Sequence, residues 1–164
     1  MRQYVNSGAA AGSVWSPKTV WDRPPSWATT TAGFLNGMDE DFLSVIGEVK
    51  KITALNTVTD GGGSQTTDER FFLLSRSEVY GGNEVTGGEG PAYPYYKDYS
   101  DLPSAGTGND SNRIKYRNGS AKYWWLRSPN ASYGYYVRTV HPGGSFDDYY
   151  AYYSLGVAPA CCII

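Results

Sequence analysis

The residues of this chain best suited to chemistry are seven tyrosines crowded between Pro129 and Leu155. They make up almost half of the chain's 15 tyrosines. Ser, Gly, Asp, Asn and Ala fill most of the gaps, and the stretch has no Lys, Glu, Gln, Met or Trp. Antibody loops use this mixture, because Tyr offers a large, stiff contact surface at low entropy cost while Ser, Gly and Asn adapt their hydrogen bonds. The segment therefore predicts a binding surface, carried by Tyr133, Tyr135, Tyr136, Tyr149, Tyr150, Tyr152 and Tyr153.

The residue types missing from this segment form a pattern of their own. Codons of the form NNC cannot encode Lys, Glu, Gln, Met or Trp, and every residue over 130–155 is compatible with NNC. Randomising the adenines of an AAC asparagine codon would produce this repertoire. Chance in a short stretch is the alternative, since the missing types are only moderately common. The pattern suggests, without deciding, that residues 130–155 form a diversified region.

Other residues here have the types, but not the spacing, that catalysis or metal binding requires. His141, the only histidine, precedes a Pro-Gly-Gly turn, and no nucleophile motif accompanies it, so a Ser-His-Asp triad is not expected. Asp147 and Asp148 are adjacent, which makes their side chains diverge on a strand, and no calcium-loop pattern follows. Solvated or ligand-contacting carboxylates are the better interpretation. We expect no catalytic residue, no metal site and no cofactor.

The two cysteines, Cys161 and Cys162, are adjacent near the end of the chain. Neighbouring residues on a strand point to opposite faces, and a disulfide between them would be strained. Two neighbouring thiols provide neither a disulfide framework nor a zinc site. We expect two reduced, small hydrophobic side chains on a terminal strand, in a chain folded in a reducing compartment.

Length and charge limit the classes of protein that fit this chain. With 164 residues it is long enough for one domain with a core. Its 14 basic and 16 acidic residues form no basic patch, so nucleic-acid binding is not expected. It has neither the apolar stretch that a membrane span needs nor a signal peptide. These features predict synthesis in the cytoplasm without membrane insertion.

Short predicted strands on both sides of the tyrosine segment would hold it in place. Residues 123–126, 137–140 and 157–164 are strand candidates, and the adjacent tyrosine pairs predict an irregular loop before the last of them. Trp124 and Trp125 alternate across the first strand, so one is expected in the core and the other near a surface. We expect the exposed tyrosines to converge on one solvent-facing surface.

The elements upstream are expected to be short as well. Residues 52–58 predict a strand, residues 71–74 a central strand, and Ser75 caps a single helical turn up to Tyr80. The whole pattern predicts an α+β fold with short twisted antiparallel strands, one or two helices and much irregular loop. The clearest helix is predicted over residues 39–51, from the helical spacing of Phe42, Val45, Ile46 and Val49.

Residues 123–129, with the letters YWWLRSP, resemble the WWLRSP signature of a bacterial and phage domain of unknown function. That domain typically ends in a GVRPAL-like strand, which residues 156–161 resemble, with Ala158 where Arg is usual and the two cysteines where Leu is common. Residues 71–75 are similar to its FLLS strand, and residues 2–7 to its first-helix motif. The resemblance covers nearly the whole chain.

Such domains resemble variants of the C-type lectin fold, as do the variable proteins of diversity-generating retroelements. In those systems a reverse transcriptase copies a template with errors at adenines and rewrites the 3′ end of a target gene, in agreement with the codon pattern. The resemblance implies a single C-type lectin-like domain over residues 1–164 that lacks the first strands of the family, with a variable region over residues 130–155.

The same resemblance divides that region into two kinds of position. The calcium-and-sugar motifs EPN, QPD and WND of C-type lectins are absent from the chain, so calcium-dependent sugar binding is not expected. The scaffold positions would be Val137, Arg138, Val140, Gly144, Ala151, Gly156 and Val157. The diversified, ligand-binding positions would be Tyr133, Tyr135, Tyr136, Thr139, His141, Pro142, Asp147, Asp148, Tyr149, Tyr150, Tyr152, Tyr153 and Leu155.

These observations predict a ligand- or receptor-binding domain with a hypervariable surface, most simply a receptor-binding protein of a phage tail. Its partner would be an unknown protein or glycan receptor on a host or neighbouring cell, and a homo-oligomer is compatible with the sequence. One alternative is a bacterial cell-surface adhesin, which an upstream signal peptide would identify. Another is a purely structural virion domain whose tyrosines pack against a neighbouring chain.

An enzyme is the remaining alternative, because formylglycine-generating enzymes share this fold class. Their chemistry needs a reactive cysteine and a metal. Reactive thiols lie in exposed, electropositive surroundings, whereas Cys161 and Cys162 belong to an apolar terminal strand. The sequence therefore favours a binder, located on the virion or on the bacterial surface.

Overall fold

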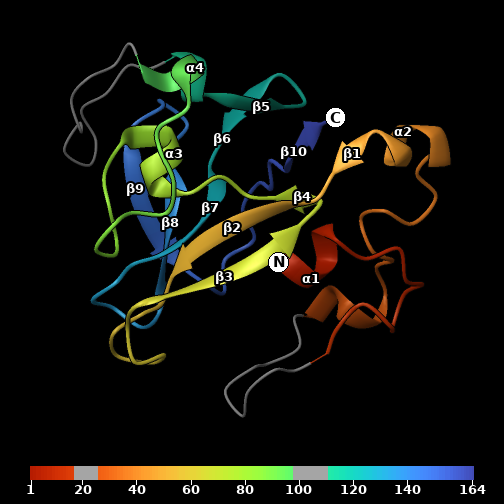
Figure 1. Cartoon of the computed structure of the whole chain (residues 1–164), viewed down its shortest axis with the longest axis horizontal. Helices are drawn as coiled ribbons and strands as arrows, with labels where there is room; N and C mark the ends of the chain where they lie inside the picture. Colours follow the sequence, from red (N-terminus) through yellow and green to blue (C-terminus); the bar gives the residue numbers. More distant parts are fainter. Residues whose placement is uncertain (17–25, 98–110) are drawn as a thin grey trace. The chain divides into compact units, whose positions relative to one another are not determined.

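The computed structural model describes residues 1–16, 26–97 and 111–164. It has a mixed α+β architecture of small, mostly antiparallel sheets, short helices and irregular connections (Figure 1). The predicted α+β class and the short antiparallel strands are thereby confirmed, while the single domain stays a prediction. The chain forms two compact units: unit 1 comprises Met1–Val49, Asp68–Phe72 and Pro159–Ile164, and unit 2 comprises Lys50–Thr67 and Leu73–Ala158.

Unit 1 contains a three-stranded antiparallel sheet in the order β1-β10-β4. Its strands are β1 (Ile46–Gly47), β10 (Ala160–Ile163) and β4 (Phe71–Phe72). Asn6, which follows α1 (Arg2–Val5), fastens β4: its Nδ2 donates to the Phe71 carbonyl at 2.7 Å and its Oδ1 accepts from the Phe71 amide at 2.9 Å. The expectation that β4 is central is wrong, because β10 takes the central place and leaves β4 at an edge.

The helix predicted over residues 39–51 is wrong beyond its first turn. α2 (Glu40–Ser44) begins at the N-cap Asp39, and the chain then enters β1 and β2 (Val49–Ala54). Gly47 lets β1 approach the end of the chain closely, since a Cβ there would lie 2.5 Å from Cγ2 of Ile164. Pairing with β10 therefore outweighs the helical spacing, which rests on three residues that suit strands equally well: Val45, Ile46 and Val49.

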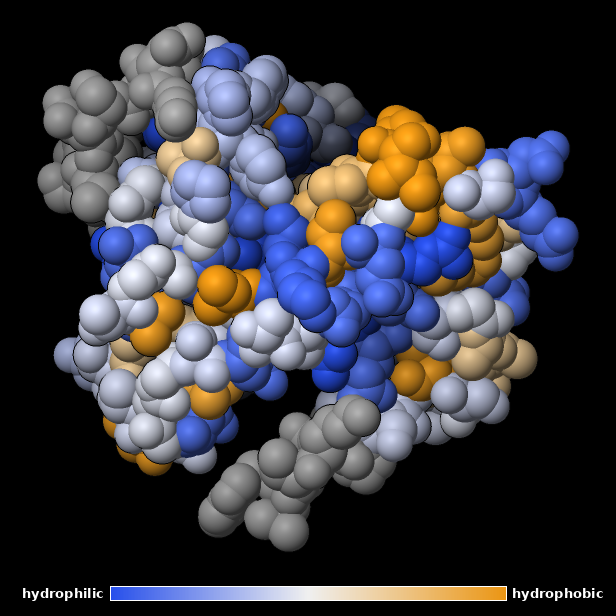
Figure 2. All heavy atoms as spheres, viewed as in Figure 1, coloured by the Kyte–Doolittle hydropathy of each residue, from blue (hydrophilic) through white to orange (hydrophobic). Residues whose placement is uncertain are grey.

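The last residues of unit 1 agree with the predicted terminal strand. Cys161 and Cys162 lie on β10 as free thiols, half-buried. The two isoleucines that follow, Ile163 and Ile164, are exposed, and Figure 2 shows hydrophobic residues gathered where β10 ends. Unit 1 also contains the short 3-10 helix η1 (Ser26–Thr29).

Unit 2 contains the sheet that carries the tyrosine-rich segment. Its strands β7 (Trp124–Pro129), β8 (Tyr136–Val140) and β9 (Phe146–Tyr150) are antiparallel neighbours in that order (Figure 1). β9 corrects the expected irregular loop, because Tyr149 and Tyr150 lie on the strand and only Tyr152 and Tyr153 lie in the turn that follows. Pairing with β8 supplies hydrogen bonds that a loop would lack.

Smaller elements complete the described part of the chain. β2 pairs with β3 (Ser64–Glu69), and β5 (Lys115–Arg117) forms a hairpin with β6 (Ser120–Lys122). The turn of that hairpin has positive φ at Asn118 (52°) and Gly119 (73°), as a type I′ turn requires. The helical elements are α3 (Arg76–Tyr80), α4 (Pro94–Lys97) and η2 (Ser111–Arg113).

Trp124 belongs to the core of unit 2. Its side chain is 1% exposed and packs among Val79, Leu126 and Val140, while its indole Nε1 donates to the Arg113 carbonyl at 2.9 Å. The prediction that at least one of the two indoles is buried is confirmed. The expectation that the other reaches a surface is wrong, because Trp125 is only 8% exposed. Its amide donates to the Gly156 carbonyl of the segment after β9, so the free edge of β7 is covered there.

α3 begins as the sequence predicts. The Ser75 hydroxyl accepts from the Glu78 amide at 3.1 Å, and the Glu78 carboxylate accepts from the Ser75 amide at 2.8 Å, which is a capping box. Glu78 also accepts from Lys51 Nζ at 3.0 Å and from Arg127 Nη1 at 2.5 Å. Burial alone would raise the pKa of Glu78, but the hydrogen bond and charge of Arg127, with Ser75 and Lys51, lower it.

Glu89 is a second buried carboxylate, and its pKa is shifted in the opposite direction to that of Glu78. Its Oε1 accepts from the Ala54 amide at 3.0 Å and its Oε2 from the Ser128 hydroxyl. Burial raises the pKa of Glu89, and these bonds with the charge of Arg127 offset that rise only in part. The pKa of Glu89 in the folded state therefore lies above its pKa in the unfolded state, which is near 4.3. The contribution of Glu89 to stability is thus full below that value and is lost as pH rises through the folded pKa.

We predict that Glu89→Gln changes this pH dependence. Gln keeps the shape without a buried charge: its oxygen can still accept from the Ala54 amide, while its NH2 group must donate to the Ser128 hydroxyl oxygen. The free energy of unfolding of the variant should therefore rise relative to that of the parent between about pH 4 and pH 7. Urea unfolding of both proteins across this range measures the difference. A difference that stays constant with pH would show that the ionisation of Glu89 does not oppose folding.

Candidate binding surface

The seven tyrosines of the segment, together with Tyr123 and His141, form one continuous set of ring contacts, which we call the tyrosine array. Rings in contact have centroids 4.7–6.3 Å apart. Tyr150 stacks on Tyr135 at an interplanar angle of 19° and on Tyr152 at 27°. The expected convergence of the tyrosines is thereby confirmed. The array consists of His141, Tyr123, Tyr149, Tyr153, Tyr152, Tyr150, Tyr136, Tyr135 and Tyr133.

Much of the array faces solvent. Tyr152 is 75% exposed, Tyr133 54% and Tyr135 53%, while Tyr136 and Tyr149, which lie on strands, are half-buried. Large exposed aromatic patches on soluble domains mark places of interaction. Tyr is also one of the residue types that carry most of the binding energy at protein interfaces.

The array wraps around the end of β9. In the register of β8 and β9, Tyr136 lies opposite Tyr150, and Tyr149 points to the other face of the sheet. Tyr153, in the following turn, contacts both faces: its ring lies 5.1 Å from that of Tyr149 and 6.1 Å from that of Tyr150. Adjacent tyrosines on a strand can therefore contribute to one connected surface.

Backbone bonds hold the loops that carry the array. The Ala151 amide donates to the Tyr135 carbonyl at 3.0 Å, which ties the turn after β9 to the loop before β8. The connection between β2 and β3 braces the same loop, because Asn56 Nδ2 donates to the Asn130 carbonyl at 2.6 Å. In Figure 1 these three connections lie at one end of unit 2. The tyrosine side chains are not part of these bonds.

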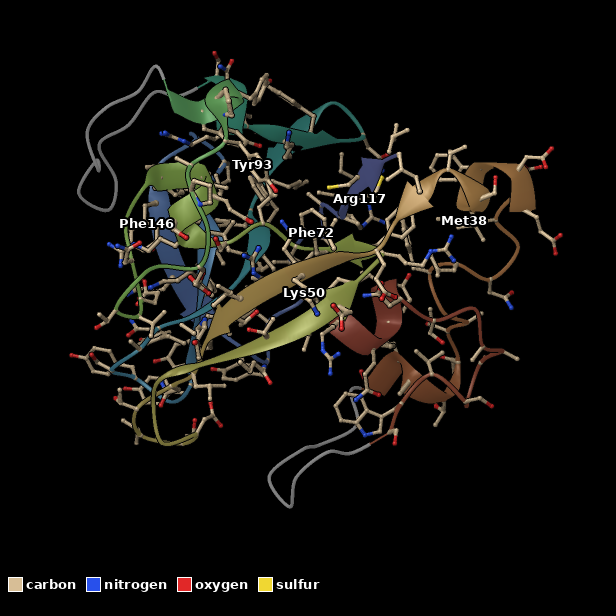
Figure 3. All side chains as sticks on the ribbon, viewed as in Figure 1. Met38, Lys50, Phe72, Tyr93, Arg117 and Phe146 are labelled. Carbon is tan, nitrogen blue, oxygen red and sulfur yellow. The ribbon has the colours of Figure 1, made fainter. Side chains whose placement is uncertain are left out.

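A set of ion pairs fixes β8 from the side of α3. Arg138 donates to both oxygens of Glu84 at 2.6 and 3.0 Å and to Asp148 at 2.9 Å, and Arg76 donates to Glu84 at 2.6 Å. The two guanidinium groups lie over the ring of Phe146, 4.6 and 4.8 Å from its centroid. Phe146 is labelled in Figure 3. Asp148, a predicted ligand-binding position, is thus engaged with the scaffold.

The remaining predicted positions divide between surface and interior. The imidazole of His141 belongs to the expected turn, where its Nδ1 accepts from the Gly143 amide at 2.9 Å. Thr139 is fully buried beside Trp125 in the register of β7 and β8, so it does not belong to the exposed surface. Its hydroxyl has no hydrogen-bond partner among the described residues. The half-buried positions include His141, Pro142, Asp147 and Leu155.

Two parts of the surface were missed by sequence reasoning. Tyr123 joins His141 to Tyr149, with ring centroids 5.0 Å away from each, because it lies one position before the buried pair on β7. Tyr123 and Trp125 are two residues apart and so share one face of the strand, and this spacing could have predicted the face on which Tyr123 lies. The exposed Val58 lies on the loop that braces Asn130, and only tertiary contacts bring that loop here.

The array perturbs the ionisation of its own phenols. A hydrogen bond with Tyr150, with burial and neighbouring charges as smaller causes, raises the pKa of Tyr136 to about 12. Burial and the charge of Tyr153 raise the pKa of Tyr152. Tyr136 should therefore keep its proton at a pH where ordinary tyrosines, with a pKa near 10, have lost theirs.

We predict that Tyr150→Phe lowers the pKa of Tyr136 toward 10, because it removes the hydrogen bond that is the largest cause of the shift. NMR of ring-labelled tyrosine during an alkaline titration measures this value. Tyr116→Phe, at an exposed tyrosine outside the array, is the control and should leave it unchanged. An unchanged pKa in the Tyr150 variant would contradict the proposed contact.

In residues 1–16, 26–97 and 111–164, no group of three or more His, Cys, Asp or Glu is placed to hold a metal ion. No helix in the same part of the chain is long and apolar enough to cross a membrane.

A family model described as a domain of unknown function (DUF6273) matches residues 1–164, the whole chain. No match is found among curated proteins or among solved structures.

Proposed function

The chain belongs to the family of the domain of unknown function DUF6273, and we propose that this member is a binding domain whose tyrosine array contacts a ligand. The observation that carries the proposal is the array itself: a continuous, largely exposed set of rings on loops that backbone bonds hold. Such a surface offers stiff aromatic anchors without a cost of ordering on binding. The ligand is a protein or glycan receptor.

We further propose that the array is diversified by a retroelement. The compatibility of residues 130–155 with NNC codons supports this. The different structural roles of the predicted scaffold and variable positions in unit 2 support it as well. Three predicted scaffold positions carry structural roles: Arg138 holds the ion pairs, Gly144 has a φ of 87°, and a Cβ at Gly156 would lie 2.7 Å from the Tyr123 carbonyl. Five of the thirteen predicted variable positions carry exposed rings instead: Tyr133, Tyr135, Tyr150, Tyr152 and Tyr153.

The finer fold and the location belong to the same proposal. Small antiparallel sheets joined by long irregular connections agree with a variant of the C-type lectin fold. A phage tail tip or a bacterial surface would present the array to its receptor. A reverse transcriptase gene and a near-repeat of the segment's DNA beside this gene would support diversification.

We predict that six tyrosines of the array can be replaced with Ser without unfolding the domain. Single changes of exposed residues usually alter stability by about 0.5 kcal/mol or less, and the loops keep their backbone bonds. A thermal melt that shows no cooperative folding would refute the display surface. The variant to be measured replaces Tyr133, Tyr135, Tyr149, Tyr150, Tyr152 and Tyr153 with Ser.

Two matched libraries test binding itself. One randomises the six tyrosines with NNC codons; the other randomises Arg138, Val140, Gly144, Ala151, Gly156 and Val157 in the same way. After yeast display and selection on a purified protein such as lysozyme, we expect folded binders from the first library only. Loss of display from both libraries, or binders from neither, would refute the proposed function.

A further inference from the structure

One end of the tyrosine array has a composition unlike the rest. Tyr123, His141, Asp147 and Tyr149 lie around one face of the β7-β8-β9 sheet, as the register of the strands shows. Asp147 and Tyr149 alternate on β9, so both side chains point to this face. The pairing Thr139↔Asp147 places Asp147 on β9 directly beside Thr139 of the middle strand β8.

The rings here meet at steep angles. Tyr123 contacts His141 at an interplanar angle of 87° and Tyr149 at 57°, both at 5.0 Å between centroids. Tyr149 in turn meets Tyr153 at 79°. Stacked rings would present a single flat face, whereas these point their faces in different directions. Walls of this kind, made of electron-rich ring faces, attract cations.

Asp147 adds a negative charge that the scaffold does not neutralise. Its neighbour Asp148 is paired with Arg138, and Glu84 is paired with Arg138 and Arg76. Asp147 accepts only from a backbone amide, that of Asp148 at 2.8 Å, and forms no ion pair within the described residues. Burial, and then the charge of Asp147, raise the pKa of Tyr123, in agreement with a carboxylate close to that phenol.

Thr139 supplies a second, independent observation. It lies on the same face, between Trp125 and Asp147 in the register, and is fully buried. Its hydroxyl makes no hydrogen bond in the part of the chain that the structure describes. An unsatisfied buried hydroxyl costs free energy, and a ligand donor that displaced the side chains covering Thr139 would recover it.

We propose that this face, formed by Tyr123, Asp147 and Tyr149 over Thr139, binds a cationic side chain, Lys or Arg, of a protein ligand. The inference rests on the proposed function and specifies its ligand: a protein patch with a basic residue at its centre. Ring faces stabilise the cation and Asp147 neutralises it. The unpaired carboxylate disfavours a phosphate or another anion at the same place.

Small probes test this without the natural ligand. We would titrate the intact chain, ring-labelled at tyrosine, with N-acetyl-arginine amide, N-acetyl-trimethyllysine amide and the neutral N-acetyl-norleucine amide. Both cations should shift the Tyr123 and Tyr149 resonances to saturation, and the neutral probe should not. Asp147→Asn should weaken cation binding about tenfold, as expected for loss of one charge beside a cation–π contact.

Controls separate this site from general charge effects. Glu48→Gln removes one negative charge in unit 1 at an exposed position and should leave the binding of both cations unchanged. Equal shifts with the neutral probe, no shift with either cation, or undiminished binding by the Asp147 variant would each overturn the cation site. A shift with methyl mannoside in place of the cations would do the same and indicate a sugar ligand. The library experiment is independent of these results, so a display surface without a cation site remains distinguishable.

Discussion

Replacing Trp124 with Ala is expected to lower the free energy of unfolding by about 3–5 kcal/mol, the cost of removing a large ring from a packed core. The indole is 1% exposed and touches α3 and β8 through Val79 and Val140, so the cavity cannot collapse without moving both. The substitution also removes the hydrogen bond from the indole Nε1 to the Arg113 carbonyl. A loss of this size is a large part of the stability of a small domain.

Two further variants separate the causes of that loss. Trp124→Phe keeps most of the apolar surface but removes the indole N–H, and should fall between the parent and the Ala variant. Tyr116→Ser, at a tyrosine that is 68% exposed, is the control and should change stability by about 0.5 kcal/mol or less. Urea unfolding of all three gives the comparison. A Trp124→Ala protein as stable as the Tyr116 control would mean that the core is not where the structure has it.

The sequence predicted the features whose causes are local. The capping box at Ser75 depends on residues three apart, and the Pro-Gly-Gly turn after His141 on its own glycines. The tyrosine array was predicted from composition, because a paratope-like mixture has no other common use. These features need no knowledge of the partner element.

Features that depend on distant partners were predicted poorly. Residues 45–49 fit a helix by spacing, and only the C-terminal strand, more than a hundred residues away, decides for a strand. The same holds for Thr139. The family resemblance places it among the variable positions, but the register with Trp125 buries it. Local patterns therefore indicated which residues are special, and strand pairing determined where they lie.

Arg127→Ala is expected to destabilise unit 2 by about 3–5 kcal/mol, as removal of one partner from a buried ion pair does. Arg127 donates to the Glu78 carboxylate at 2.5 Å and to the carbonyls of Leu73 at 2.9 Å, Glu89 at 2.6 Å and Ile52 at 3.1 Å. It thus ties β7 to α3, to β2 and to the segment after α3. Its loss leaves the Glu78 charge buried with Lys51 as the remaining cation.

The pH dependence of this loss identifies its cause. In the parent the pKa of Glu78 is lowered, so its stabilising contribution is present above the unfolded value near 4.3 and is lost as pH falls through the folded pKa. The penalty of Arg127→Ala should therefore be large at pH 7 and shrink in acid, where Glu78 is protonated in both proteins. Arg117→Ala, at an exposed arginine of β5, should show neither effect.

A double variant tests whether the charge or the packing matters. Glu78→Gln removes the buried charge that loses one of its two cations in Arg127→Ala, so the two changes together should cost less than the sum of their separate losses. The coupling should disappear at acid pH for the same reason as the single penalty. A penalty for Arg127→Ala that is independent of pH and additive with Glu78→Gln would mean that Arg127 acts through its carbonyl bonds alone, with the ion pair contributing nothing to the stability of the sheet under the tyrosine array.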